Sequence, residues 1–158
     1  MKKTLILVFF LNFSCSPDFS EISFSDITFI ENSLKVIRII GGTKEDVVKK
    51  VLATDDGGFV IVGHTKSTDG DFENKNREGN DIFLTKLDPK GQIIWTNTYG
   101  GSDDDIGNDV VESSDGSFYI IGYSKSNDGD ASINKGQHDN WLLKTDSFGK
   151  LLWEKSYG

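Results

Sequence analysis

An internal repeat constrains the fold of this 158-residue chain more than any other feature. Residues 55–71 read DDGGFVIVGHTKSTDGD and residues 114–130 read SDGSFYIIGYSKSNDGD, with ten of the seventeen positions identical. The match extends over two complete units, residues 41–99 and residues 100–158. Each unit is therefore expected to be one structural module, and neighbouring modules are expected to bury their apolar surfaces against each other.

Each unit predicts four short strands joined by tight turns, because Gly and Asp recur where hairpins need backbone freedom. The apolar runs FVIV, IFL, FYII and WLL are continuous and do not alternate with polar residues. Such runs are typical of strands that are covered on both faces. The sequence thus predicts an all-β fold of two four-stranded antiparallel sheets. The expected strands are residues 47–54, 59–65, 81–88 and 92–98, then 109–114, 118–124, 140–146 and 150–156.

The segment before the first unit carries a weaker version of the same pattern. DITFIENSLKVIRIIGG follows the order of apolar and turn residues in DIFLTKLDPKGQIIWTNTYGG. Residues 26–40 are therefore predicted to be the last two strands of a degenerate preceding unit, and residues 16–25 a tether.

The first fifteen residues, MKKTLILVFFLNFSC, have the pattern of an export signal. Two lysines precede an apolar run that is shorter than the roughly 20 residues of a membrane-spanning helix. Cys15 is the only cysteine of the chain, so the fold has no disulfide. The segment 1–15 resembles a bacterial lipoprotein signal, which implies lipidation of Cys15 and an exported, lipid-anchored protein of the outer membrane or cell surface. The alternative is an ordinary cleaved signal with an incidental cysteine.

The repeat itself resembles a known family. The succession YGGSDDD, a DGGF-like turn, an IVG strand, an S-x-D-G-D loop and L-D-x-x-G-x-x-x-W is similar to the bacterial β-propeller repeat of roughly sixty residues found in surface lipoproteins. The resemblance implies an incomplete β-propeller, with two four-stranded antiparallel blades plus half of a preceding blade. Family members close a ring of many blades. The chain is therefore expected to close a ring as a homo-oligomer, to pack on a partner, or to be a fragment of a larger propeller protein.

Acidic loops end the repeated segment in each unit and are candidate calcium sites. Calcium takes hard oxygen ligands, and a cation would relieve the repulsion within each Asp-Gly-Asp. The alternative is a solvated hairpin in which Asp side chains bond the local backbone. The spacing matches no complete EF-hand loop. The candidate ligands are Asp69, Asp71, Asp81, Asp128, Asp130 and Asp139.

Trp95 and Trp153 end the two copies of L-D-x-x-G-x-x-x-W. This pattern is similar to the tryptophan-docking pattern of quinoprotein-type propellers, which implies that both indoles pack between neighbouring blades. An aromatic residue at the same place in every repeat favours packing over a quinone site. Calcium is the only cofactor that the sequence suggests.

A catalytic site is not expected. There is no G-x-S-x-G elbow, Walker loop or G-x-G-x-x-G, and His64 and His138 occupy non-equivalent positions. The net charge of −8 makes nucleic acid a poor partner. We expect a non-catalytic cell-envelope lipoprotein whose blades bind or scaffold protein or glycan. The alternative is a fragment of a propeller-type hydrolase or lyase, which the close likeness of the two units disfavours.

Overall fold

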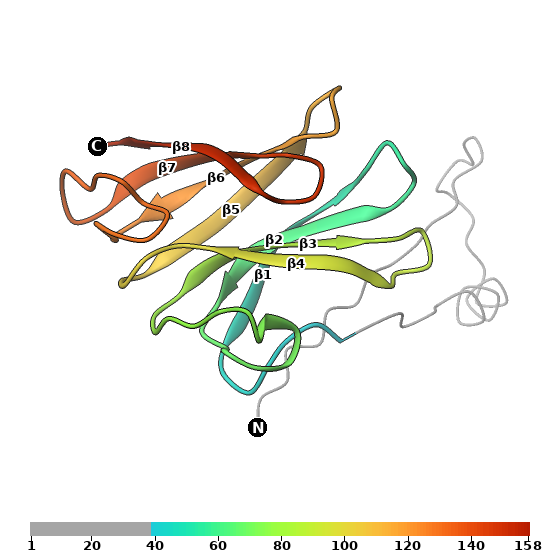
Figure 1. Ribbon diagram of the computed structural model, residues 1–158, viewed down its shortest axis with the longest axis horizontal. Helices are drawn as coiled ribbons and strands as arrows, with labels where there is room; N and C mark the ends of the chain where they lie inside the picture. The colour runs from blue at the N-terminus through green and yellow to red at the C-terminus, as the bar shows by residue number, and fades with distance from the viewer. Residues whose placement is uncertain (1–38) are drawn as a thin grey trace, which may run out of the picture.

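The computed structural model describes residues 39–158. The predicted signal, the tether and all but the last two residues of the predicted half blade lie outside the described residues. The described part folds into two four-stranded antiparallel sheets, each with its strands in chain order (Figure 1). The prediction of an all-β fold with one sheet for each repeat is confirmed.

The strand bounds follow the repeat closely. The first sheet contains β1 (Asp46–Ala53), β2 (Phe59–Thr65), β3 (Asp81–Leu87) and β4 (Ile93–Tyr99). A short 3-10 helix, η1 (Gly70–Phe72), lies in the long connection between β2 and β3. The second sheet contains β5 (Asp105–Glu112), β6 (Phe118–Ser124), β7 (Asp139–Thr145) and β8 (Leu151–Tyr157).

The hairpins use the turn chemistry that the sequence predicts. Between β3 and β4, Asp88 Oδ1 accepts hydrogen bonds from the backbone N–H groups of Lys90 and Gln92, at 2.8 and 2.7 Å. Gly91 follows with a φ of 77°, a conformation that favours glycine. Asp146 repeats this arrangement between β7 and β8. An Asp at the start and a Gly three residues later therefore determine these two turns.

One strand starts earlier than predicted. β5 begins at Asp105, four residues before the expected start, and a bulge shifts its pairing with β6 between Gly107 and Asp109. A Cβ at Gly107 would lie 2.9 Å from the carbonyl oxygen of Gly63, so the two repeats come into close contact here. Gly and Asn have low strand propensity, which explains why the sequence pattern did not extend the strand over this bulge.

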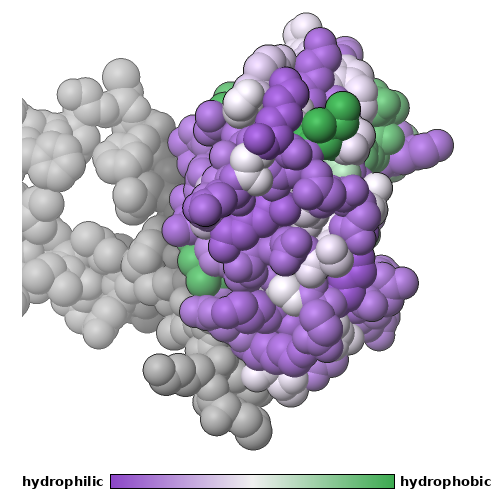
Figure 2. Space-filling view, turned by 90° about the vertical axis from the view of Figure 1, so that its left-hand side faces the viewer, coloured by the Kyte–Doolittle hydropathy of each residue, from purple (hydrophilic) through white to green (hydrophobic). Residues whose placement is uncertain are grey.

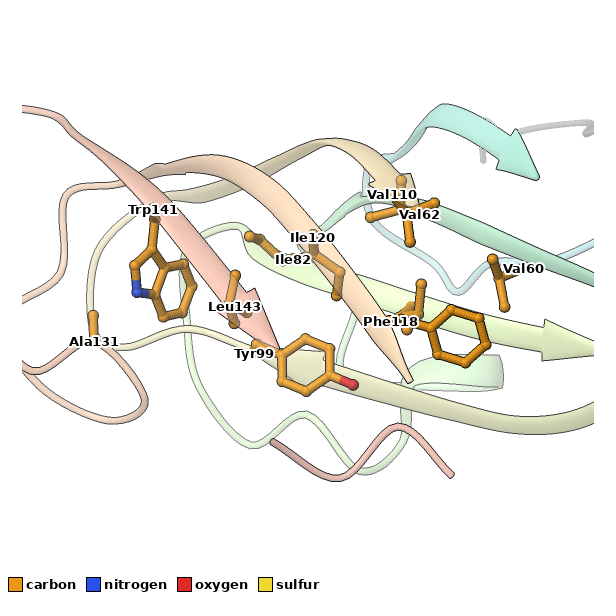
Figure 3. Packing of buried hydrophobic residues seen from close by; sticks show 11 residues of the cluster. Val60, Val62, Ile82, Tyr99, Val110, Phe118, Ile120, Ala131, Trp141 and Leu143 are labelled. Atoms are coloured by element: carbon orange, nitrogen blue, oxygen red, sulfur yellow. The ribbon is translucent and has the colours of Figure 1, made fainter. Parts of the chain in front are cut away.

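Each sheet has two chemically distinct faces. We call the face that points away from the preceding repeat the leading face, and the face that points back toward it the trailing face. The leading face carries Val60, Val62 and Leu84 in the first sheet, and the equivalent Tyr119, Ile121 and Leu142 in the second. The trailing face carries the residues in between, such as Ile61 in β2 and Ile120 in β6. The leading face of the first sheet packs against the trailing face of the second (Figure 3).

This interface forms the main core of the described residues. Its side chains from the first sheet interdigitate with Phe118, Ile120 and Leu143 of the second, and Trp141 is fully buried among them. Burial of a large apolar side chain contributes roughly 1.5–3 kcal/mol. The contact between the repeats is therefore a major source of stability for the second sheet.

The opposite faces of the stack differ from each other. On the trailing face of the first sheet, Ile61 and Phe83 are buried and pack with Ile40 and Phe72. On the leading face of the second sheet, Val111 and Ile121 are 56% and 50% exposed. The predicted covering on both faces is therefore correct for β2 and β3, but wrong for β6 and β7 in the part of the chain that the structure describes.

The side of the molecule seen in Figure 2 is largely hydrophilic, with hydrophobic residues confined to small separate patches. This agrees with a composition in which 25 acidic and 17 basic residues keep the surface charged. Large exposed apolar side chains are thus informative where they gather on one face.

Candidate functional site at the junction of the repeats

The Asp-Gly-Asp loops bind the backbone at the start of their own repeat. In the first repeat, Asp71 Oδ2 accepts a hydrogen bond from the N–H of Gly41 at 3.0 Å, and Asp69 Oδ1 accepts one from Thr43 at 2.9 Å. In the second repeat, Asp130 and Asp128 bind the N–H groups of Gly100 and Ser102 at 3.0 and 2.7 Å. The two acidic residues therefore act as clamps on a Gly-Gly segment that precedes them by about thirty residues.

A third carboxylate completes each clamp. Asp46 Oδ2 accepts a hydrogen bond from Gly42 at 2.9 Å, and Asp105 Oδ2 accepts one from Gly101 at 2.8 Å. A Cβ at Gly42 would lie 2.3 Å from Asp69 Oδ1, so a side chain there would displace the clamp. Consecutive backbone N–H groups form an anion-binding concavity, and in each repeat the chain's own carboxylates fill it.

Arg77 connects the two repeats. Its Nη2 lies 3.1 Å from Asp81 Oδ2, at the start of β3, and 3.3 Å from Asp130 Oδ2 in the second repeat. Lys75, which is buried, lies 3.8 Å from Asp81 Oδ1. Because Asp130 also binds Gly100, one acidic residue is shared by the backbone clamp and by the ion pair across the junction.

Burial raises the pKa of two acids at this junction. The side chain of Asp81 is fully buried, and this loss of water raises its pKa to about 6, with the nearby Asp105 adding to the effect. Burial also raises the pKa of Asp105. Removal from water lowers the pKa of the Lys75 ammonium for the same reason. The junction thus concentrates charged groups in a place where their charges are unfavourable.

The six predicted calcium ligands do not share one environment. The four Asp-Gly-Asp carboxylates bind backbone N–H groups, Asp81 pairs with Arg77, and Asp139 Oδ2 accepts a hydrogen bond from the N–H of Lys135 at 2.8 Å. Within residues 39–158, no group of three or more Asp, Glu, His or Cys side chains is arranged to hold a metal ion. Calcium binding remains a prediction.

The equivalent tryptophans lie in different environments. Trp95 in β4 makes an edge contact with Phe118 of the second sheet at 6.2 Å between ring centroids, and lies against Gly149 in the β7–β8 turn. Trp153 in β8 packs instead on Tyr119 of its own sheet at 5.9 Å and is 37% exposed. Trp95 therefore contacts both sheets, whereas Trp153 lies on the open leading face.

Two polar contacts at this junction were missed by sequence reasoning. The hydroxyl of Tyr99 donates to the carbonyl of Gly149, and Asn97 Nδ2 donates to the carbonyl of Phe148 at 3.1 Å. Together with Trp95 they bind β4 to the β7–β8 turn. The recurrence of Tyr99 as Tyr157 was the available signal, since it places the same phenol at the same position of both repeats.

The two histidines are also in unlike settings. His64 lies half-buried in β2, where burial lowers its pKa. The ring of His138 contacts Tyr123 at 5.3 Å between centroids.

Neither a protein-family model nor a curated protein matches this chain. No helix among residues 39–158 is long and apolar enough to cross a membrane.

Proposed function

We propose that the chain is a non-catalytic lipoprotein of the cell envelope, whose sheets are β-propeller-type blades that form a binding or scaffolding surface for protein or glycan. The observation that carries the proposal is the packing of a leading face on a trailing face. These two faces belong to equivalent sheets but are not the same face. A contact between unlike faces can be repeated indefinitely, and it closes into a ring if its rotation allows.

The likeness of the two repeats supports a scaffold. Clamps, turns and apolar faces recur at equivalent residues, whereas catalysis needs one site that differs from its copies. The groups with shifted pKa at the junction, Asp81 and Asp105, are buried between the repeats and bind Arg77, Gly101 and Ser126. Their contacts support a structural role.

A fragment of a larger propeller protein, including a propeller-type hydrolase or lyase, is the second candidate. One observation favours it. The residues that dock the first sheet onto the second have equivalents on the leading face of the second sheet, and most of these, including Val111, Ile121 and Tyr157, are exposed. A further blade would cover them in the same way.

The lipid anchor is tested by replacing its attachment site. In a bacterial host, Cys15→Ala is expected to move the chain from the membrane fraction to the soluble fraction and to abolish incorporation of labelled palmitate. Ser16→Ala is the matched control at the next position and should leave both unchanged. Membrane association that survives Cys15→Ala would contradict the anchor.

The binding role is tested on the anchored chain with a photo-crosslinking residue at Ile121, on the exposed leading face, and at Lys90, in the exposed β3–β4 turn as a control. We expect a specific product from position 121 in envelopes and none from position 90, and only a product that differs in mass from two copies of the chain counts for a separate ligand. Absence of any product at position 121 would contradict a binding surface there.

A further inference from the structure

The leading face of the second sheet is an apolar surface without a cover in the described chain. Trp153, Tyr157, Val111 and Ile121 are exposed on it, and a shallow depression runs past Tyr119 and Leu142. The equivalent residues of the first sheet pack against the second sheet. Those equivalents are Leu52, Val60, Val62, Leu84, Trp95 and Tyr99. An exposed face with the composition of a covered one indicates an interaction surface.

Within residues 39–158, the apolar sheet face that a second copy leaves most open to this one is the same leading face. Residues 39–158 contain four sheet faces. Two of them form the interface between the repeats, and the centre of the trailing face of the first sheet, at Ile61 and Phe83, is buried. The fourth is the leading face of the second sheet itself. Two copies would therefore meet through the same face, which requires a two-fold axis.

The charges on this face complement themselves under such an axis. The strand register places Asp109, Ile121, Leu142 and Lys155 in one row across β5, β6, β7 and β8. The row has an acid at one end and a base at the other. A two-fold axis parallel to the strands, between β6 and β7, lays β5 over β8 of the second copy. Asp109 then faces Lys155 of the second copy, and Ile121 faces its Leu142.

The neighbouring row fits in the same way. It contains Val111, Tyr119, Lys144 and Trp153. The axis brings Val111 against the indole of the second copy and Tyr119 against its Lys144. Lys144 Nζ already lies 5.1 Å from the Tyr119 ring within one chain, so this cation–π contact is retained or exchanged on pairing. The strands of two packed sheets cross at no more than about 30°, so the facing rows stay nearly parallel. The long charged side chains at the ends of the rows therefore remain within reach of their partners in the second copy.

We propose that the leading face of the second sheet is an interface between two copies of this chain, paired about this two-fold axis. With strands about 4.8 Å apart and a rise of about 3.3 Å per residue, four strands of seven or eight residues present a face of about 19 by 23 Å. This face, about 440 Å² in plan, is smaller than the about 800 Å² that a stable interface buries on each partner, so the dimer is expected to be weak and to form at micromolar concentrations and above.

The test is sedimentation equilibrium of the full chain carrying Cys15→Ser, so that no lipid is attached and the result does not depend on the anchor. Between about 1 μM and about 500 μM, we expect a reversible shift from monomer to dimer. Asp109→Lys gives a row with two bases and Lys155→Asp a row with two acids, and each change should weaken pairing about tenfold or more. An equimolar mixture of these two variants should dimerise again, and so should the double variant Asp109→Lys/Lys155→Asp.

Asp109 also lies 3.5 Å from Lys50 of the first sheet. Asp109→Asn is therefore the control, because it removes this pair without reversing the charge, and it should weaken pairing less than Asp109→Lys. Every variant contains the same apolar N-terminal segment, so association through that segment would be the same in all variants and would not depend on the charges at positions 109 and 155. A monomer at every concentration, a ring of more than two copies, or a mixture that does not restore pairing would overturn the proposal. A monomer would also favour a further sheet or a foreign protein as the cover.

Discussion

Leu84 and Leu142 provide a direct test of the stacking, because the repeat places the same residue at equivalent positions in different surroundings. Leu84 is fully buried between the two sheets. Leu142 lies on the leading face of the second sheet and lines the shallow depression there. The same substitution, Leu to Ala, therefore removes the same atoms from a covered face and from an open one.

The expected losses differ by a known physical cause. Leu84→Ala removes a buried isobutyl group and leaves a cavity between two packed sheets, which costs about 3 kcal/mol of the free energy of unfolding. Leu142→Ala removes a side chain that is already partly exposed to water and leaves no closed cavity, so its cost is smaller, about 1 kcal/mol.

Urea unfolding followed by far-UV circular dichroism measures both costs. With a slope of about 1.5 kcal/mol per molar urea, Leu84→Ala should lower the midpoint by about 2 M and Leu142→Ala by about 0.7 M. The protein is kept at about 1 μM, where pairing of copies contributes little to the midpoint. Equal midpoints for the two variants would refute the packing of a leading face on a trailing face.

Three further predictions follow from the junction. Asp130→Ala should cost about 1–3 kcal/mol, because it leaves the N–H of Gly100 and the guanidinium of Arg77 without this acceptor, whereas the exposed Asp103→Ala should be nearly neutral in the same urea assay. The pKa of Asp81 is about 6 in the folded chain against an ordinary value of 3.8. The folded state therefore binds the proton more tightly, and stability should fall by about 3 kcal/mol in total as pH rises from about 3 to about 7, with most of the loss between the two pKa values. Urea midpoints of Asp81→Asn should lack this part of the pH dependence, and an unchanged dependence would assign it to other groups. Calcium binding at the Asp-Gly-Asp loops predicts a higher melting temperature in 5 mM calcium than in EDTA, with the rise lost in Asp128→Asn; a difference below about 1 °C would leave these carboxylates as ligands of backbone N–H groups alone.

The sequence predicted the strands well because the repeat and the turn residues agree with each other. Two copies of Asp-x-x-Gly mark the β3–β4 and β7–β8 turns, and the apolar runs between turns are too short for helices and are flanked by turn residues, which favours strands. β5 is the exception. Its first residues pair with β6 only beyond a bulge, and a bulge leaves no periodic signal in a run of Gly, Asn and Asp.

The role of the Asp-Gly-Asp loops could not be decided from their own residues. Two close carboxylates are equally suited to a cation and to backbone N–H groups, and the choice depends on what lies beside the loop. The partner is a Gly-Gly segment about thirty residues earlier, brought there by the path of β1 and β2. The signal was present in the sequence, since each repeat contains one Gly-Gly and one Asp-Gly-Asp, but their contact is a property of the sheet.

The exposure of the leading face of the second sheet could not be predicted from local sequence. Leu84 and Leu142 are the same residue in the same local pattern, and Val62 and Ile121 are nearly so. At these positions local sequence therefore assigns the two leading faces the same environment, while the structure buries Val62 and Leu84 and leaves Ile121 exposed and Leu142 partly exposed. What separates them is the presence of a following sheet, which is a property of the stack and not of the residues. The faces also differ in sequence, with Tyr119 for Val60, Asn140 for Ile82, Asp109 for Lys50 and Lys155 for Asn97. The last two differences underlie the proposed self-complementarity of the outer face, and reversing their charges tests it.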